Sequence, residues 1–149
     1  GKSWLEVPLG VAEIEPKVDG AANLGLWAEV FWLPAVLVTD PRVEWEGIDE
    51  TTALLRVPFG DVTQTFVTRF DPKTGMVRLI TSMRYKDAED EEKTLWLNDA
   101  RAWEAIEGIP TMEVAALIWL DEGTPWAVFD IDEIVYNADV SEYIRATGP

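Results

Sequence analysis

The side chains best suited to chemistry in this chain are carboxylates, because its 149 residues include neither His nor Cys. Their absence excludes a Ser-His-Asp triad, a thiolate nucleophile, disulfides, iron–sulfur clusters and the common zinc sites. An enzyme of this composition would have to work with carboxylates, Tyr or Lys. We predict no cofactor and no metal site.

Two aspartates near the C-terminus have the spacing of a catalytic pair. On a β-strand, Asp130 and Asp132 would point to the same face about 7 Å apart. That arrangement suits a paired-carboxylate hydrolase or a hard-cation site. The other interpretation is a polar strand face, and acidic residues are so abundant here that pairs arise by chance, so we predict no catalytic residue. The carboxylates considered are Asp49, Glu50, Asp130, Asp132 and Glu133.

The overall charge narrows the classes of partner. Acidic residues number 28 against 12 basic ones, and the net charge is −16. No cluster of Lys and Arg supplies the footprint that nucleic acids or anionic membranes require, so we predict no nucleic-acid binding. The run "KDAEDEEK", residues 86–93, lacks the Gly and the alternating spacing of a calcium loop, and we interpret it as a solvated loop.

One apolar segment interrupts this acidic chain. Between Leu24 and Val38 only Glu29 is charged, and the segment is shorter than the roughly 20 residues that span a bilayer, so we predict no transmembrane segment. We expect a helix over about 21–33, capped by Asp19 or Asn23. Because this helix is apolar nearly all round, we expect most of its faces to be buried.

The remainder of the chain has the alternation of β-strands joined by short turns. Val43 and Trp45 share one face of a strand, as do Leu55 and Val57 in the next, and "DPKTG" at 71–75 marks a hairpin turn. We predict a mainly β (α+β) domain over residues 1–149. Its core element is a curved antiparallel sheet or half-barrel of about 6–9 strands, with the apolar helix on the concave face.

The aromatic side chains of the helix and sheet could line a hydrophobic pocket, with Glu29 and Arg84 as its polar groups. The alternative is that the aromatic residues are plain core and that Arg84 anchors a loop. Glu29 would then face solvent or pair with an Arg from the sheet (Arg56, Arg69 or Arg84), because a buried unpaired carboxylate is costly. The predicted ligand-binding residues are Trp27, Glu29, Phe31, Trp32, Trp45, Arg84 and Trp119.

Several short motifs occur in a characteristic order: "AEVFWLPAVLV", "VEWEGID", "FDPKTGMV", "RYKD", "GIPT" and "YNADV". Over about Gly20 to Val140 the chain resembles a bacterial domain family of unknown function, with an acidic-x-x-W-x-P helix and a W-x-x-I-D strand. The resemblance implies a longer, membrane-anchored protein with an N-terminal membrane segment and further strands upstream. It implies no enzyme class. The architecture is also similar to half-barrel carriers of lipoproteins and lipids, which is a weaker, fold-level analogy.

Three functions are compatible with these features. The first is a non-catalytic binding module for a lipid or other hydrophobic ligand in the bacterial envelope, membrane-associated and outside the cytoplasm. The second is an interaction domain whose apolar helix packs on a partner chain, on a second copy in a homodimer, or on upstream strands. The third, which we favour least, is a carboxylate-based hydrolase.

Overall fold

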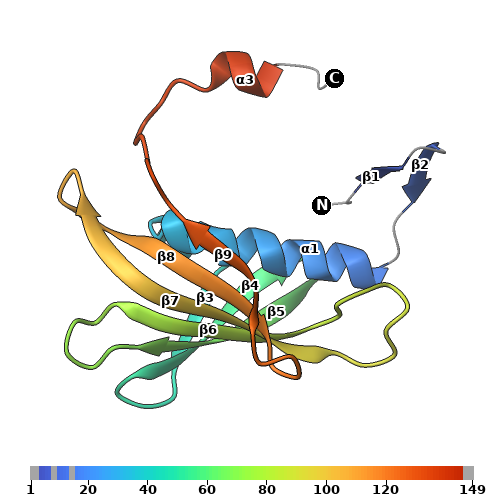
Figure 1. Cartoon of the computed structure of the whole chain (residues 1–149), viewed down its shortest axis with the longest axis horizontal. Helices are drawn as coiled ribbons and strands as arrows, with labels where there is room; N and C mark the ends of the chain where they lie inside the picture. The colour runs from blue at the N-terminus through green and yellow to red at the C-terminus, as the bar shows by residue number, and fades with distance from the viewer. Residues whose placement is uncertain (1–3, 8–9, 14–15, 146–149) are drawn as a thin grey trace.

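A computed structural model describes residues 4–7, 10–13 and 16–145, and the side chains of 16–143. Its centre is a seven-stranded antiparallel sheet in which each strand pairs with the next one along the chain (Figure 1). The strands are β3 (Glu44–Gly47), β4 (Thr52–Phe59), β5 (Val62–Phe70), β6 (Val77–Arg84), β7 (Thr94–Ile106), β8 (Ile109–Trp119) and β9 (Pro125–Asp130). Because β3 and β9 are both edge strands, the sheet is open, and the predicted mainly β class with a curved antiparallel sheet is confirmed.

The turns between strands have the chemistry that their geometry requires. At the predicted "DPKTG" hairpin, the Asp71 carboxylate accepts hydrogen bonds from the Lys73 and Thr74 amides, and Gly75 has a φ of 72°. Glu107 and Gly108 form a two-residue turn in which both residues have positive φ, as a type I′ hairpin demands. Irregular pairing of β7 with β8 between Ala100 and Trp103 bends these long strands around the helix.

The helical segment lies across the concave face of the sheet (Figure 1). It consists of α1 (Pro16–Glu29), a 3-10 turn η1 (Val30–Trp32) and the short α2 (Val36–Thr39). The predicted start near residue 21 was wrong, because Pro16 opens the helix with the fixed φ that suits a first helical position. Asn23 lies inside α1 and donates hydrogen bonds to the Pro58 carbonyl and to Gln64 Oε1, so it ties α1 to β4 and β5.

The core lies between this segment and the sheet, but the helix is buried on one side only. Leu24, Trp27 and Phe31 are buried against sheet residues such as Phe66 and Trp96. The expectation that most helix faces are buried was wrong, since the outward side chains of Leu26, Leu33 and Val38 are 59%, 56% and 77% exposed. Among the described residues, no helix has the length and apolar character to cross a bilayer.

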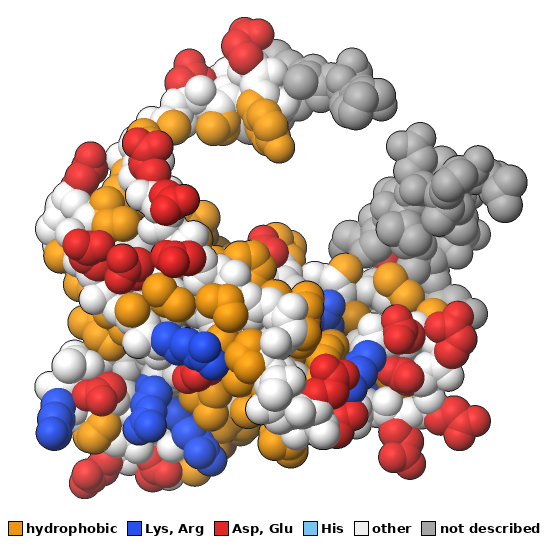
Figure 2. All heavy atoms as spheres, viewed as in Figure 1, with side chains coloured by type: hydrophobic (Ala, Val, Ile, Leu, Met, Phe, Trp, Pro, Cys, Tyr) orange, Lys and Arg blue, Asp and Glu red, His pale blue; other side chains and the backbone are white. Residues whose placement is uncertain are grey.

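Three further elements lie outside this sheet. β1 (Trp4–Val7) and β2 (Gly10–Glu13) pair with each other in a separate two-stranded sheet, and α3 (Ser141–Arg145) follows the C-terminal end of β9. Acidic side chains are spread over much of the molecular face in Figure 2, with few basic ones among them. This distribution agrees with the net charge of −16.

Candidate functional site

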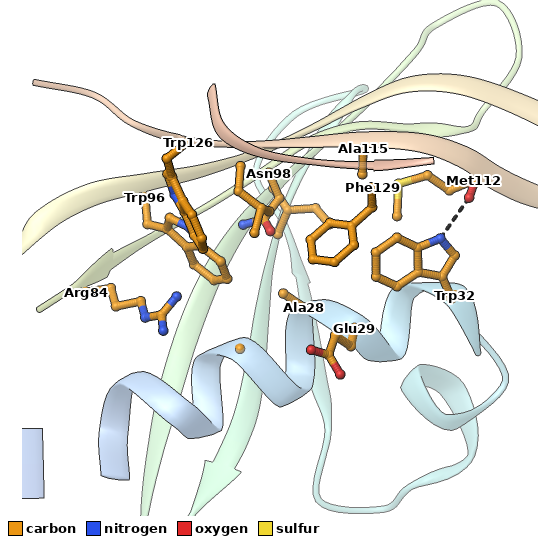
Figure 3. A pocket seen from close by; sticks show the side chains of 13 residues that line it. Ala28, Glu29, Trp32, Arg84, Trp96, Asn98, Met112, Ala115, Trp126 and Phe129 are labelled. Atoms are coloured by element: carbon orange, nitrogen blue, oxygen red, sulfur yellow. Dashed lines mark hydrogen bonds between the residues drawn. The ribbon is translucent and has the colours of Figure 1, made fainter. Parts of the chain in front are cut away.

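A cavity of about 180 Å³ opens between α1 and strands β6 to β9. We call it the helix–sheet cavity, and Figure 3 shows the side chains around it. Trp96 and Trp126 lie toward one end, Trp32 and Phe129 toward the other, and Asn98 lies between them. The lining residues are Gly25, Ala28, Glu29, Trp32, Ile80, Arg84, Trp96, Asn98, Met112, Ala115, Leu117, Trp126 and Phe129.

Small residues on opposite walls create this space. Gly25 and Ala28 belong to the helix, and Ala115 lies opposite them on β8. A Cβ atom added to Gly25 would meet no atom within 4 Å, so the void begins at the helix backbone. Protein interiors are normally packed to crystal-like density, which makes a gap of this size a specific feature of the fold.

Aromatic side chains from the edge strand β9 form the mouth of the cavity. Trp126 is 52% exposed and Phe129 is 40% exposed, and the Phe129 ring meets Trp32 edge-on with 5.7 Å between ring centroids. Ala127 pairs with Leu117 and Pro125 with Ile118, so Trp126 is an extra residue in a β-bulge. A bulge redirects a side chain, which explains why Trp126 and Phe129 both reach the cavity.

Arg84, the last residue of β6, supplies a cation to the cavity. Its guanidinium lies 4.4 Å from the Trp96 ring centroid and 5.7 Å from that of Trp119. Burial lowers the pKa of Arg84 below its ordinary value, although an arginine remains charged in proteins. Within the described part of the chain, Arg84 has no ion-pair partner.

Three buried donors around the cavity have no hydrogen-bond acceptor in the structure. They are Nε of Arg84, Nε1 of Trp96 and Nδ2 of Asn98. Trp96 and Asn98 are 2% and 7% exposed, so bulk water does not reach these groups freely. A fourth buried polar atom without a partner, Oγ1 of Thr68 on β5, does not line the cavity.

Three other tryptophans have their indole N–H groups bonded to backbone carbonyls. Trp32 donates to the Met112 carbonyl at 2.7 Å, which fixes one wall of the cavity. Trp45 donates to the Leu37 carbonyl at 2.9 Å and Trp103 to the Val77 carbonyl at 3.0 Å. Trp96 differs from these three tryptophans, because its buried indole N–H has no acceptor.

A second hollow, which we call the Trp45 groove, lies at the other side of η1. It has a volume of about 360 Å³ and almost entirely apolar walls. It contains no buried donor without a partner. Its lining residues are Phe31, Pro34, Leu37, Val38, Trp45, Phe70, Val77 and Trp103.

The structure divides the seven predicted ligand-binding residues among several places. Glu29, Trp32 and Arg84 line the helix–sheet cavity, whereas Phe31 and Trp45 line the Trp45 groove. Trp27 is core, and Trp119 packs behind Arg84 and Trp96 without lining the cavity.

Two alternatives were considered for Glu29 outside a pocket role, namely exposure to solvent and an ion pair with an Arg from the sheet. Glu29 is exposed, and its carboxylate points away from the sheet in Figure 3. It forms no ion pair with Arg56, Arg69 or Arg84.

Ten of the thirteen lining residues were not predicted from the sequence, among them Gly25, Trp96, Asn98, Trp126 and Phe129. Trp96 and Asn98 had a usable signal, since alternate residues of a strand share a face. Trp126 had no such signal, because its side chain is directed by a β-bulge in which Trp126 is the extra residue between Pro125 and Ala127.

The candidate carboxylates do not have the strand-face arrangement expected from the sequence. Strand β9 ends at Asp130, so the expectation that Asp130 and Asp132 share a strand face was wrong. Asp49 follows β3 and accepts a hydrogen bond from the Thr51 amide, and bonds of this kind lower the pKa of Asp49. Within the described residues, no group of three or more acidic side chains could hold a metal ion.

Comparison with known proteins identifies a family but no characterised relative. A family model described as a family of unknown function, DUF6544, matches residues 7–131. This match confirms the resemblance to an uncharacterised domain family. No curated protein and no solved structure matches the chain significantly.

Proposed function

The chain belongs to this family of unknown function, and we propose from its own structure that it is a non-catalytic binding module. Its ligand would be a hydrophobic small molecule or lipid. The observation that supports this proposal is the helix–sheet cavity, which has aromatic walls and an open mouth. Pockets that bind small molecules are concave, mostly apolar and contain few polar groups. A location in the bacterial envelope is part of the same proposal.

The size of the cavity favours a small ligand, or a small part of a larger one. An apolar cavity of about 150 Å³ in another protein holds benzene, and the present cavity measures about 180 Å³. One ring or a short alkyl chain would therefore fill it. A longer tail would leave through the mouth beside Trp126 and Phe129, whose exposed rings offer it apolar surface.

The absence of a catalytic arrangement near the cavity favours binding over hydrolysis. Glu29 is the only carboxylate among the described residues that line it, and general acid–base hydrolysis of a glycoside uses two. Asp49 and Asp130 both lie outside the lining.

A substitution that fills the cavity tests the proposal. Gly25→Leu places a side chain in the free space beside the helix, whereas Ala22→Leu adds the same side chain at an exposed position of α1. We expect calorimetric titration with octanol to show binding to the wild type and to Ala22→Leu, and binding weakened about tenfold or more by Gly25→Leu. No octanol binding to a folded wild-type protein would contradict the proposal.

The endogenous ligand can be sought in the same preparation. Native mass spectrometry of gently purified wild-type protein should show a discrete added mass, and organic extraction should recover it. The Gly25→Leu protein, purified in parallel, should carry less of that mass than Ala22→Leu.

The exposed outer side of the helix supports a second candidate, an interaction domain. Leu26, Leu33 and Val38 are each more than half exposed, and exposed apolar patches mark contact surfaces. Light scattering after size-exclusion chromatography tests this role, including the homodimer. A dimer that Leu26→Glu dissociates would support the role, and a wild-type monomer at all concentrations would count against self-association.

A further inference from the structure

The three donors without acceptors lie together because of the register between β6 and β7. Ser82 pairs with Trp96 and Arg84 with Thr94, so Arg84 and Trp96 are diagonal neighbours on one face. Asn98 is the next residue of β7 on that face. Diagonal neighbours lie about 7–8 Å apart, so the long side chains of Arg84 and Trp96 can reach one group. Asn98, which pairs with Ile80, extends this row of donors beyond Trp96 along β7. One acceptor placed between these side chains could therefore be shared.

The position of Arg84 is unusual for a chain with 28 acidic residues. Four other basic side chains of the sheet and its loops have carboxylate partners: Arg42 with Asp40, Arg56 with Glu46, Lys86 with Asp121 and Glu122, and Arg101 with Asp99. Arg69, Lys73, Arg78 and Lys93 have no ion pair within the described residues, but they are exposed to water. Arg84 is more deeply placed than Arg42 or Arg101 and still has none within the described part of the chain. A half-buried charge without a partner destabilises a fold, as does a buried donor without an acceptor.

We infer that the ligand of the helix–sheet cavity is an amphipathic anion, whose apolar body fills the cavity and whose carboxylate or phosphate head accepts hydrogen bonds from Arg84, Trp96 and Asn98. This inference rests on the proposed function and adds the chemical class of the ligand. The head lies at the Arg84 end of the cavity, and the body extends past Ala115 toward Trp32 and Phe129.

The chemistry of the donors selects an anion over a neutral acceptor. A guanidinium is permanently charged and presents a planar fork that matches carboxylate and phosphate oxygens. Hydrogen bonds between charged groups are roughly twice as strong as neutral ones, and more so where water is excluded. An indole N–H and an amide N–H add two neutral donors beside that fork. An alcohol would satisfy one donor and leave the guanidinium charge without a counter-charge.

A cationic ligand fits the cavity poorly. The face of the Trp96 ring, which would attract a cation, is already covered by Arg84 at 4.4 Å. A second positive charge there would be repelled by the guanidinium. Glu29 is exposed and points away from the sheet, so it does not offset that repulsion.

Titration of the wild-type protein with octanoate and octanol tests the inference, because the two probes share one apolar body. Octanoate is expected to bind at least about tenfold more tightly, as hydrogen bonds to charged groups allow. Octyl phosphate in the same series distinguishes the two anionic heads, and tighter binding of either anion than of octanol supports the inference. Equal affinities for all three would overturn it and leave the proposed function intact. No binding of any probe would overturn both.

Two variants locate the head group. Arg84→Met keeps the length of the side chain without its donors, and Asn98→Leu keeps similar volume without the amide. Each should reduce the preference for octanoate over octanol, by about tenfold or more for Arg84→Met and by about threefold for Asn98→Leu. A circular dichroism spectrum and a urea unfolding transition similar to those of the wild type show that a variant is folded.

The control is Arg69→Gln, which removes the same charge from an exposed position of β5 outside the cavity. It should leave the octanoate preference as in the wild type. A preference that persists in both Arg84→Met and Asn98→Leu would overturn the assignment of these donors to the head group. The donors would then be hydrated by ordered water, which is the usual partner of buried polar groups in small cavities.

Discussion

The helix–sheet cavity and the Trp45 groove lie on opposite sides of η1 and are both rich in aromatic side chains. Neighbouring residues of η1 separate them, since Trp32 lines the cavity and Phe31 lines the groove. In the groove, the indoles of Trp45 and Trp103 donate to backbone carbonyls. In the cavity, Trp96 and Asn98 keep buried donors without acceptors. The two hollows are alike in aromatic content but differ in whether their buried polar atoms have partners.

The largest expected effect on the free energy of unfolding comes from replacing a phenylalanine of the hydrophobic core. A phenylalanine at the mouth of the helix–sheet cavity serves as the comparison. Phe66 is fully buried and meets Phe31 edge-on, whereas Phe129 is 40% exposed. We expect Phe66→Ala to lower the free energy of unfolding by about 3–5 kcal/mol. Phe129→Ala should cost less than half of that and should weaken octanol binding. Urea unfolding measures both, and equal losses would contradict this assignment of core and mouth.

Replacement of single tryptophans should separate stability from binding. Trp103→Phe leaves the Val77 carbonyl without its donor, so the free energy of unfolding should fall by about 1–3 kcal/mol while octanoate affinity stays the same. Trp96→Phe removes a donor that has no protein acceptor, so octanoate should bind about three- to tenfold more weakly. Calorimetry and urea unfolding measure the two effects. A loss of octanoate affinity in Trp103→Phe as large as that in Trp96→Phe would break the comparison.

A smaller effect is expected from Gly25→Ala. Gly25 lies inside α1 and an added Cβ meets no atom within 4 Å, so Ala should raise the free energy of unfolding by about 0.5–1 kcal/mol. Gly60→Ala is the contrasting change, because Gly60 has a φ of +59° and Ala is strained there. Thermal unfolding that shows destabilisation by Gly25→Ala would mean that the space beside the helix is not free.

The smallest expected effect is on the pH dependence of stability. It arises at the end of α2, which borders the Trp45 groove. The Arg42 side chain lowers the pKa of Asp40 from its ordinary value of 3.8 to about 2. A lowered pKa contributes stability above about pH 3.8 that is lost as the pH falls through about 2. The Arg42 side chain is 67% exposed, although that of Asp40 is only 15% exposed, so salt should weaken the effect. Arg42→Gln should return the pKa of Asp40 toward 3.8, which carboxyl NMR titration detects, and an unchanged pKa would contradict the role of Arg42 in lowering it.

Much of the fold could be predicted from local patterns. Alternating apolar residues and turn residues such as Asp71 and Gly75 specify antiparallel strands, and the register follows from which face is buried. The start of α1 was misplaced, because a Pro was given less weight than the apolar run that follows it. The outer face of the helix was expected to be covered, since an all-round apolar pattern does not say which side the sheet takes.

The candidate site was harder to predict, because its members are distant in the sequence. Glu29, Trp32 and Arg84 were identified from residue type alone, and the cavity brings them to Asn98 and Trp126 through four strands. The bulge at Trp126 and the free space beside Gly25 are properties of packing. The missing acceptors of Trp96 and Asn98 become visible only when every neighbouring atom is placed.

The most direct test is a ¹H–¹⁵N NMR titration of the indole N–H groups with octanoate, with peaks assigned through Trp96→Phe, Trp45→Phe and Trp103→Phe. If the cavity binds an anion, the Trp96 peak should move downfield as its N–H gains an acceptor, and octanol should move it less. The peaks of Trp45 and Trp103 should stay in place, because their donors are already bonded. A Trp96 peak that does not respond, or a larger response from Trp45 and Trp103, would contradict anion binding in the helix–sheet cavity.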